Sequence, residues 1–186
     1  MEYTGTLQSY ELESGILSFD FSKGILVCRE PDEGRRKRWV KKLDGVARVG
    51  NITEDGERFY VACENGDANG QFLAVEKHTG ETEWFIPGRS FLQLVYGEGL
   101  YLIFVDGSMR HYLLRVDTAD GSTLWHHGVD EDLVEYSFRA RTITLRYASG
   151  KSEFLDTESG LRARRKDGTF LSNIRRRMSI ISLDGA

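Results

Sequence analysis

Short apolar runs, each closed by a turn signal, recur along nearly the whole chain. The runs are rich in β-branched and aromatic residues, and Gly, Asn and Asp separate them. This pattern is typical of β-strands joined by hairpins. A sustained apolar period of about 3.6 residues with caps at both ends, which indicates a helix, is missing. The pattern therefore predicts an all-β fold.

One hairpin occurs twice, at Phe72–Trp84 and at Tyr112–Trp125. Each copy has an apolar strand, a turn that ends in Gly, and a second strand with a Trp four residues past that Gly. Gly80 and Gly121 are 41 positions apart, and the two Trp residues have the same separation. A fixed period near 40 with one hairpin per period indicates a repeat architecture.

Turn signals divide the chain into four such repeats within one predicted domain, residues 1–186. We expect each repeat to form four antiparallel strands, as in a β-propeller blade. The repeats and a C-terminal closing segment cover approximately residues 3–42, 46–87, 91–128, 133–166 and 169–186. Three arrangements are compatible with this number of blades: a small closed ring, an open arc of stacked sheets, or two chains that pair to complete a larger ring.

The repeated Gly and Trp have a structural interpretation. Gly takes a positive-φ turn conformation without steric cost, and a Trp ring on the next strand can wedge between neighbouring sheets. In the first repeat the Trp lies five residues past Gly34, and a bulge or a longer loop would supply the extra residue. In the fourth repeat Arg164 stands in place of the Trp. We therefore predict that blades dock through Trp39, Trp84, Trp125, Gly80, Gly121 and Gly160.

The hairpin resembles the repeat of the pyrroloquinoline-quinone-type, or quinoprotein-like, β-propellers. That repeat runs Ala-Leu-Asp, two residues, Thr-Gly, three residues, Trp. The copy Ala74–Trp84 follows it nearly throughout, the next keeps Asp117, Gly121 and Trp125, and the last keeps Asp156 and Gly160. The resemblance implies blade-like sheets. Family members ordinarily close with seven or eight blades, whereas this chain has strands for about four.

The dehydrogenases of this family hold a quinone cofactor and a calcium-type ion inside a much larger propeller, often beneath a pair of adjacent cysteines. This chain has no adjacent cysteines and no convincing ligand cluster. Its two cysteines, Cys28 and Cys63, are too few for a disulfide framework, and we expect them to be buried and reduced. A bridge between them would require an exported protein. We predict no cofactor.

The composition and the terminal sequence exclude some classes of protein without indicating a particular function. The chain is 40% hydrophobic and 29% charged, with a net charge of -4, which nominates no partner. No apolar run is long enough to predict a transmembrane helix. The first residues lack the basic and apolar regions of a signal peptide, so we expect a cytoplasmic protein.

Candidate chemistry in the sequence is sparse. His126 and His127 are neighbours on a predicted strand, so their side chains point to opposite faces and cannot share a metal without a bend. The loop Asn65–Gly70 lacks the bidentate Glu of a calcium loop. No Ser-His-Asp order, phosphate loop or HExxH pattern is present. The sequence predicts no catalytic or metal-binding residues.

Basic residues gather on the last strand of the first and the fourth repeat. If those blades became neighbours, the two clusters would form one surface for an anionic partner. The alternative is that outer strands are charged because they are exposed edges. No aromatic residue stands among these basic residues, which argues against a platform for single-stranded nucleic acid. The residues of this predicted patch are Arg35, Arg36, Lys37, Arg38, Arg162, Arg164, Arg165 and Lys166.

The sequence therefore predicts a non-catalytic binding or scaffold module that contacts another protein. This prediction follows the family resemblance, because the non-enzymatic quinoprotein-like propellers serve as interaction platforms. A homodimer is compatible with it. Two alternatives from other classes stay open: a small immunity- or inhibitor-type protein, and an enzyme with an unrecognised site.

Overall fold

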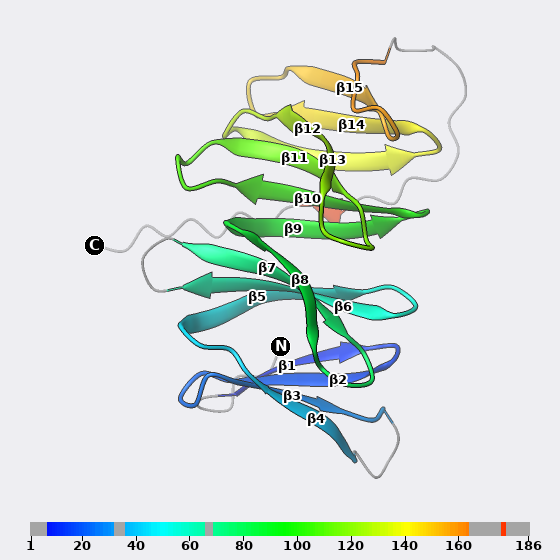
Figure 1. The fold of residues 1–186 in the computed structure, drawn as a ribbon. Coiled ribbons are helices and arrows are strands. Elements are labelled where there is room, and N and C mark those ends of the chain that lie inside the picture. The colour runs from blue at the N-terminus through cyan, green and yellow to red at the C-terminus, as the bar shows by residue number, and fades with distance from the viewer. Residues whose placement is uncertain (1–6, 32–35, 66–68, 164–175, 178–186) are drawn as a thin grey trace. The chain divides into compact units, whose positions relative to one another are not determined.

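The computed structural model describes residues 7–31, 36–65, 69–163 and 176–177. Every regular element in these ranges is a β-strand, and Figure 1 shows them gathered into sheets. No helix long and apolar enough to cross a membrane occurs in this part of the chain. The chain divides into two compact units, Met1–Leu124 and Trp125–Ala186. The prediction of a single domain over residues 1–186 stays a prediction.

The strands form four sheets of four strands each. The first contains β1 (Leu7–Leu12), β2 (Gly15–Asp20), β3 (Ile25–Arg29) and β4 (Lys37–Lys42). The second contains β5 (Val46–Glu54), β6 (Arg58–Asn65), β7 (Gly70–Glu76) and β8 (Thr82–Pro87). The third contains β9 (Arg89–Tyr96), β10 (Gly99–Val105), β11 (His111–Val116) and β12 (Thr123–Gly128). The fourth contains β13 (Leu133–Arg139), β14 (Thr142–Tyr147), β15 (Ser152–Asp156) and β16 (Arg176–Arg177).

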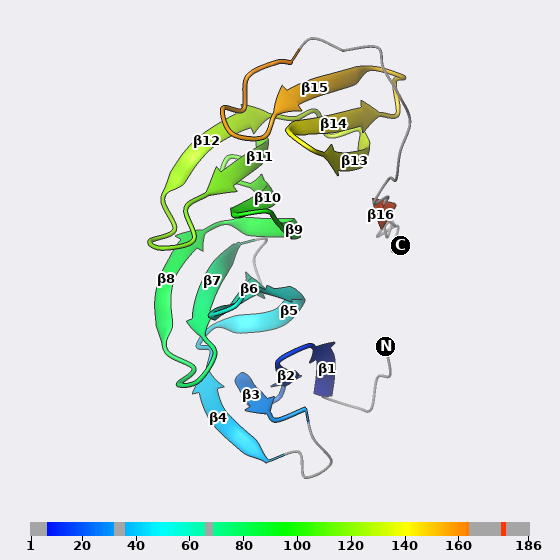
Figure 2. The same cartoon turned by 90° about the vertical axis from the view of Figure 1, so that its right-hand side faces the viewer.

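In the first three sheets the strands lie in sequence order, as successive hairpins require. Neighbouring strands run antiparallel, so the predicted all-β class with four-stranded blades is confirmed. In the first unit the sheets lie side by side, with β1 near β5 and β5 near β9 (Figure 2).

The fourth sheet departs from the other three. Its order is β15-β14-β13-β16, so the fourth strand comes from the C-terminal region and pairs with β13. The sequence predicted a fourth repeat that ends near residue 166. Near that end the structure describes an isolated bridge between Leu155 and Arg162, and the described range closes at Ala163 before β16. An edge strand such as β13 presents unpaired backbone groups, which the C-terminal strand satisfies. The rest of the predicted closing segment 169–186 lies outside the described residues.

The second sheet has a core on each face. Along β6, Phe59, Val61 and Cys63 join a cluster with residues of the first sheet, whereas Tyr60 and Ala62 join a cluster with the third. Successive strand residues point to opposite faces, so a strand between two sheets needs apolar residues at every position. This explains the continuous apolar run Phe59–Cys63 within β6.

The first of these clusters contains both cysteines as free, buried thiols. Burial raises the pKa of the Cys28 thiol, and it raises the pKa of Cys63 to about 12. Because the thiolate is the reactive form, neither side chain should react readily near pH 8. We expect a thiol-specific disulfide reagent to label no cysteine of the native chain quickly, and to label two after unfolding in urea. Fast labelling of the native chain would contradict the buried placement.

Candidate functional site

Turns with the same hydrogen-bond pattern join the last two strands of the second sheet and of the third sheet. A third copy follows β15. The first residue of each turn is acidic, and its side chain accepts a hydrogen bond from the backbone N–H two residues later. The last residue of each turn is a Gly with a φ of 67–77°, in the left-handed region that favours glycine. The Gly N–H donates to the carbonyl of the first residue at 2.9–3.0 Å. The three copies, called outer turns below, are Glu76–Gly80, Asp117–Gly121 and Asp156–Gly160.

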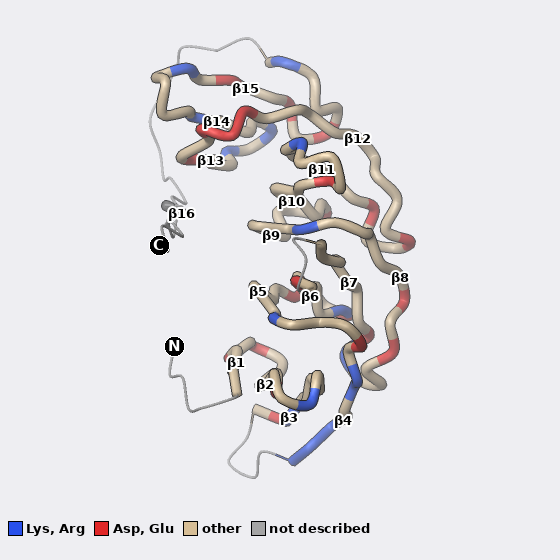
Figure 3. The backbone as a smooth tube through the Cα atoms, turned by 90° about the vertical axis from the view of Figure 1, so that its left-hand side faces the viewer, with Lys and Arg blue, Asp and Glu red and all other residues tan. Residues whose placement is uncertain are grey.

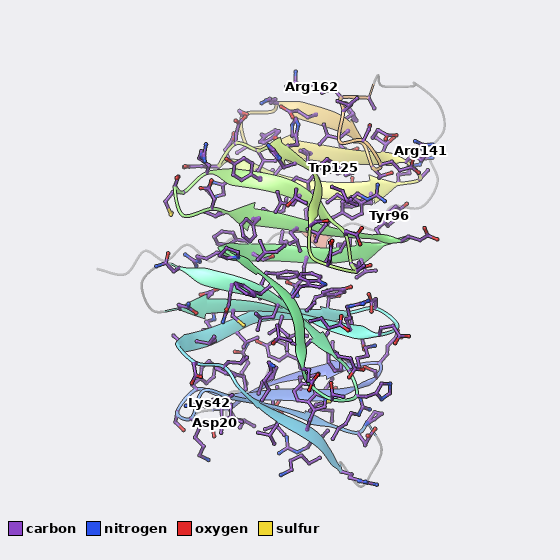
Figure 4. The ribbon with its side chains drawn as sticks, in the orientation of Figure 1. Asp20, Lys42, Tyr96, Trp125, Arg141 and Arg162 are labelled. Atoms are coloured by element: carbon purple, nitrogen blue, oxygen red, sulfur yellow. The ribbon has the colours of Figure 1, made fainter. Side chains whose placement is uncertain are left out.

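The Trp of the preceding sheet packs against each outer turn. The Trp84 indole N–H donates to the Thr118 carbonyl at 2.9 Å, and a Cβ atom at Gly121 would lie 2.6 Å from the Trp84 ring. Trp39 makes the same pair of contacts with the Lys77 carbonyl, at 2.8 Å, and with Gly80. Figure 4 labels the third of these residues, Trp125. Its indole N–H donates to the Thr157 carbonyl at 3.1 Å, and its ring lies against Gly160. The predicted docking residues are therefore in mutual contact, and their energetic role stays a prediction.

The offset of Trp39 has its origin in the loop before β4. A bulge precedes both Trp39 in β4 and Trp84 in β8, so the bulge does not distinguish the two repeats. The closing backbone bond runs from Glu30 to Arg36, one position wider than the equivalent bond from Glu76 to Glu81. The longer loop, the second of the two explanations from sequence, supplies the extra residue.

A recess of about 660 Å³ opens between the first and second sheets. Three separate turns build it: the β1–β2 hairpin, the β5–β6 hairpin and the outer turn of the second sheet. All three belong to the first unit. The lining residues are Glu11, Leu12, Glu13, Ser14, Thr53, Glu54, Asp55, Gly56 and Lys77.

Lys77 is the centre of a polar network at this recess. Its side chain is only 8% exposed, forms an ion pair with Glu54 at 2.6 Å and donates a hydrogen bond to the Asp55 carbonyl. Ser14, from the first sheet, donates its hydroxyl to Glu54. Arg38 completes the network by donating to the carbonyls of Ser14, at 3.1 Å, and Lys77, at 3.3 Å. These contacts join the first and second sheets.

Two carboxylates of the recess, those of Glu54 and Asp55, have lowered pKa values and stay charged near neutral pH. Burial works against ionisation of Glu54, but hydrogen bonds from Lys77 and Ser14 outweigh it and lower the Glu54 pKa. Asp55 behaves likewise, because hydrogen bonds from the Tyr60 hydroxyl (2.5 Å) and two backbone N–H groups outweigh burial and lower its pKa. Glu11, Glu13, Glu54 and Asp55 contribute four negative charges, against one positive charge on Lys77.

This arrangement is suited to binding. The Ser14 hydroxyl donates to a carboxylate that is already paired with Lys77, and no histidine lines the recess. A serine nucleophile needs a free base beside it. Across the described ranges, no group of three or more His, Cys, Asp and Glu side chains could hold a metal ion.

The predicted basic patch is only partly described. Figure 3 shows basic residues concentrated on β4, and Lys37 at its start and Arg36 just before it are exposed. Arg38 instead forms an ion pair with Glu30 at 2.7 Å in addition to its bonds in the recess network. Arg162 lies 3.5 Å from Glu153. Arg35, Arg164, Arg165 and Lys166 lie outside the described residues, so the merging of the two clusters stays a prediction.

In the second unit, His127 has a partner that the sequence did not indicate. Its Nε2 atom lies 2.6 Å from the carboxylate of Glu153, which is 7% exposed. Lys151 lies 2.7 Å from the same carboxylate. Burial opposes ionisation of Glu153, but these two partners outweigh it and lower the Glu153 pKa. His127 thus helps to satisfy a buried charge.

Comparison with known proteins gives a fold and no sequence family. No family model and no curated protein matches the chain. Among solved structures, BamB from Moraxella catarrhalis is similar with a TM-score of 0.60 and 19% identity, over 84% of this chain and 46% of BamB. A europium-containing methanol dehydrogenase is similar with a TM-score of 0.58 and 9% identity, over 83% of this chain and 40% of the dehydrogenase chain. The computationally designed Ika4 protein is similar with a TM-score of 0.57 and 12% identity, over 80% of this chain and 88% of the Ika4 chain.

These similarities show a β-propeller-like fold of four-stranded sheets. The chain spans less than half the length of the BamB and methanol dehydrogenase chains. Two of the three structures, BamB and Ika4, are not named for a reaction, and one is a dehydrogenase. Since identity is below 20%, the fold is what they share.

Proposed function

We propose that the chain is a non-catalytic module that binds a protein partner, and that the recess between the first and second sheets is its binding site. The observation that carries the proposal is the recess itself, in which side chains from three turns converge around a fixed network. A concave site with a few convergent polar groups, held by rigid sheets, is the usual form of a recognition site. Membership of the quinoprotein-like repeat family, which the hairpin motif suggests, agrees with this role.

The chemistry of the recess selects among partners. Its lining carries four carboxylates and one ammonium group, and Lys77 is already neutralised by Glu54. Glu11 and Glu13 are exposed at the hairpin of the first sheet. An arginine or lysine side chain on a partner would find complementary charge there, and complementarity of this kind sets specificity and association rate. The proposed partner is thus a protein segment that presents basic side chains.

A displayed library of random peptides, selected on the immobilised chain, tests this proposal. We expect the selected peptides to be enriched in Arg and Lys, because the recess carries an excess of negative charge. The doubly substituted variant Glu11→Lys/Glu13→Lys should bind a selected peptide at least about tenfold more weakly than the wild type. Isothermal titration calorimetry measures the difference.

The matched control is Glu98→Lys, which makes the same substitution in the equivalent hairpin of the third sheet. This variant should bind the peptide as the wild type does. Selected peptides without basic residues, or equal weakening in both variants, would contradict the recess as the binding site.

A further inference from the structure

An arginine at the start of β9 is positioned by packing. The Arg89 side chain lies against Gly70, where an added Cβ atom would come within 2.9 Å of the Arg89 Cγ atom. The Gly88 N–H donates to the Gly70 carbonyl at 2.8 Å, so the backbone just before Arg89 is tied to β7. Figure 1 shows β7 and β9 next to each other, and they are in contact. The stem of Arg89 therefore stands on a rigid support.

The guanidinium of Arg89 lies over an exposed aromatic ring. Its Cζ atom is 5.0 Å from the centroid of the Phe91 ring. Phe91 is the extra residue of a bulge in β9, because its two neighbours pair with consecutive residues of β10. A bulge re-aims the side chain that it carries, and Phe91 is 46% exposed. The His111 ring stacks on Phe91 at 6.2 Å. We call Arg89, Phe91 and His111 the arginine cluster.

The N–H donors of Arg89 are open to a ligand. A guanidinium has five N–H groups in a planar fork. The Glu64 carboxylate lies 3.7 Å away, which is too long for a hydrogen bond, and within the described residues the Arg89 guanidinium makes none. Arg38 and Arg110, in contrast, have carboxylate oxygens at 2.7 and 2.9 Å. The Arg89 side chain is 25% exposed, so a ligand can reach it.

The charges around the arginine cluster favour a ligand group with a single negative charge. Glu64 is opposite Arg48 in the β5–β6 pair, and Arg48 is exposed. Two arginines against one glutamate leave one positive charge. A carboxylate matches this charge and can accept two parallel hydrogen bonds from one guanidinium. A phosphate group carries about −1.5 to −2 charges, so Glu64 would repel it more strongly.

The exposed apolar side chains of this surface suit a protein segment. Phe91 is one of them. Met109, two residues before His111 and between β10 and β11, is another and is 58% exposed. A small free anion would leave both uncovered, whereas a peptide places apolar side chains beside its acidic ones. Aromatic residues, Met and Arg are also the types enriched in protein interfaces.

This surface is separate from the recess. Asp55 lines the recess just before β6 begins, whereas Glu64 is near the last residue of β6. At about 3.3 Å per residue, the strand from Arg58 to Glu64 spans about 20 Å. The recess and the arginine cluster have no residue in common, so each proposal can fail without the other.

We propose that the arginine cluster is a second binding site, which takes a carboxylate side chain of an acidic protein segment with apolar residues beside it. Arg89 binds the carboxylate through two of its N–H groups. Phe91 orients the guanidinium and contacts the neighbouring apolar side chain. An arginine that is already ordered loses little conformational freedom on binding, which favours affinity.

Fluorescence anisotropy of a labelled peptide of alternating glutamate and leucine residues tests this site. The signal should saturate with the wild-type chain, and Arg89→Gln should weaken binding at least about tenfold, because the paired hydrogen bonds are lost. Arg89→Lys keeps the charge without the planar fork, so it should weaken binding about threefold or more. Phe91→Ala should also weaken binding, and its circular dichroism should match the wild type because the ring is exposed.

Lys37→Gln is the matched control, since it removes one positive charge at an exposed position on β4. This variant should bind the peptide as the wild type does. A wild-type chain that does not bind the peptide, or equal weakening by Lys37→Gln and Arg89→Gln, would overturn the proposal. Tighter binding of the same peptide with phosphoserine in place of glutamate would contradict the assignment of a carboxylate.

Discussion

Replacing Trp84 with Ala should lower the free energy of unfolding by about 3–5 kcal/mol, the range for removing a large buried aromatic side chain. The ring is only 7% exposed, and its centroid lies 5.8 Å from that of Tyr60 and 6.2 Å from that of Phe72. Its N–H also bonds to the Thr118 carbonyl of the next sheet, which would lose that partner. Urea unfolding followed by circular dichroism measures the change.

The neighbouring residue gives a matched control for this prediction. Phe85 points to the other face of β8 and is 61% exposed, so Phe85→Ala should change stability by less than about 0.5 kcal/mol. Gly121→Ala should destabilise as well, because its φ is 77° and a Cβ atom would overlap the Trp84 ring. A loss below about 1 kcal/mol for Trp84→Ala would show that this ring is not a joint between sheets.

Replacing Lys77 with Ala should cost about 2–4 kcal/mol of stability. The substitution leaves the Glu54 carboxylate without its cation in a poorly hydrated site, and removing one partner of a buried pair is strongly destabilising. The expected loss is below that of a fully enclosed pair, because the Glu54 side chain keeps 13% exposure to water. The control is Lys23→Ala, whose side chain is 68% exposed beside Asp20 and should show no resolvable change.

A double-mutant cycle assigns this cost to the ion pair. Lys77→Met combined with Glu54→Gln should be less destabilising than the sum of the two single changes, because the pair is removed as a unit. The dependence of stability on pH gives a second test of the ion pair. The folded-state pKa of Glu54 is lowered, so its contribution is present above the unfolded-state pKa near 4.3 and is lost as pH falls below it. Strict additivity in the cycle would contradict the network.

The fold was largely predictable because its signals are local. The hairpin that the sequence predicted twice, at Phe72–Trp84 and at Tyr112–Trp125, is formed by β7 and β8 and again by β11 and β12. Alternation within a run and a Gly at each turn are properties of a few adjacent residues. The fourth sheet was harder to predict, because its last strand pairs with β13 from about forty residues away, a contact that no local pattern indicates.

The recess could not be predicted for the same reason. Ser14, Glu54 and Lys77 come from three turns in two sheets, and only the stacking of the hairpins brings them together. One signal was available: the second position of the outer turn is Lys77 in one copy and Thr118 and Thr157 in the others. The charged Lys77, at a position where the other two copies have threonine, is the sequence difference that coincides with the recess.

Arg38 shows how composition can mislead. It stands in a run of basic residues, which suggested a surface for anions, yet its guanidinium bonds to Glu30 and to the carbonyls of Ser14 and Lys77. Its role follows from its neighbours in space rather than from its neighbours in sequence. Lys37, one position earlier, is exposed and stays available to a partner.

The most direct test of the binding site is a map of amide chemical-shift changes when a selected basic peptide is added to the isotopically labelled chain. If the recess binds the peptide, the largest changes fall on Glu13, Ser14, Gly56 and Lys77, and they saturate with the affinity measured by calorimetry. Changes centred on Lys37 and Arg162, or spread evenly over the outer strands, would show that the partner binds elsewhere on the molecule.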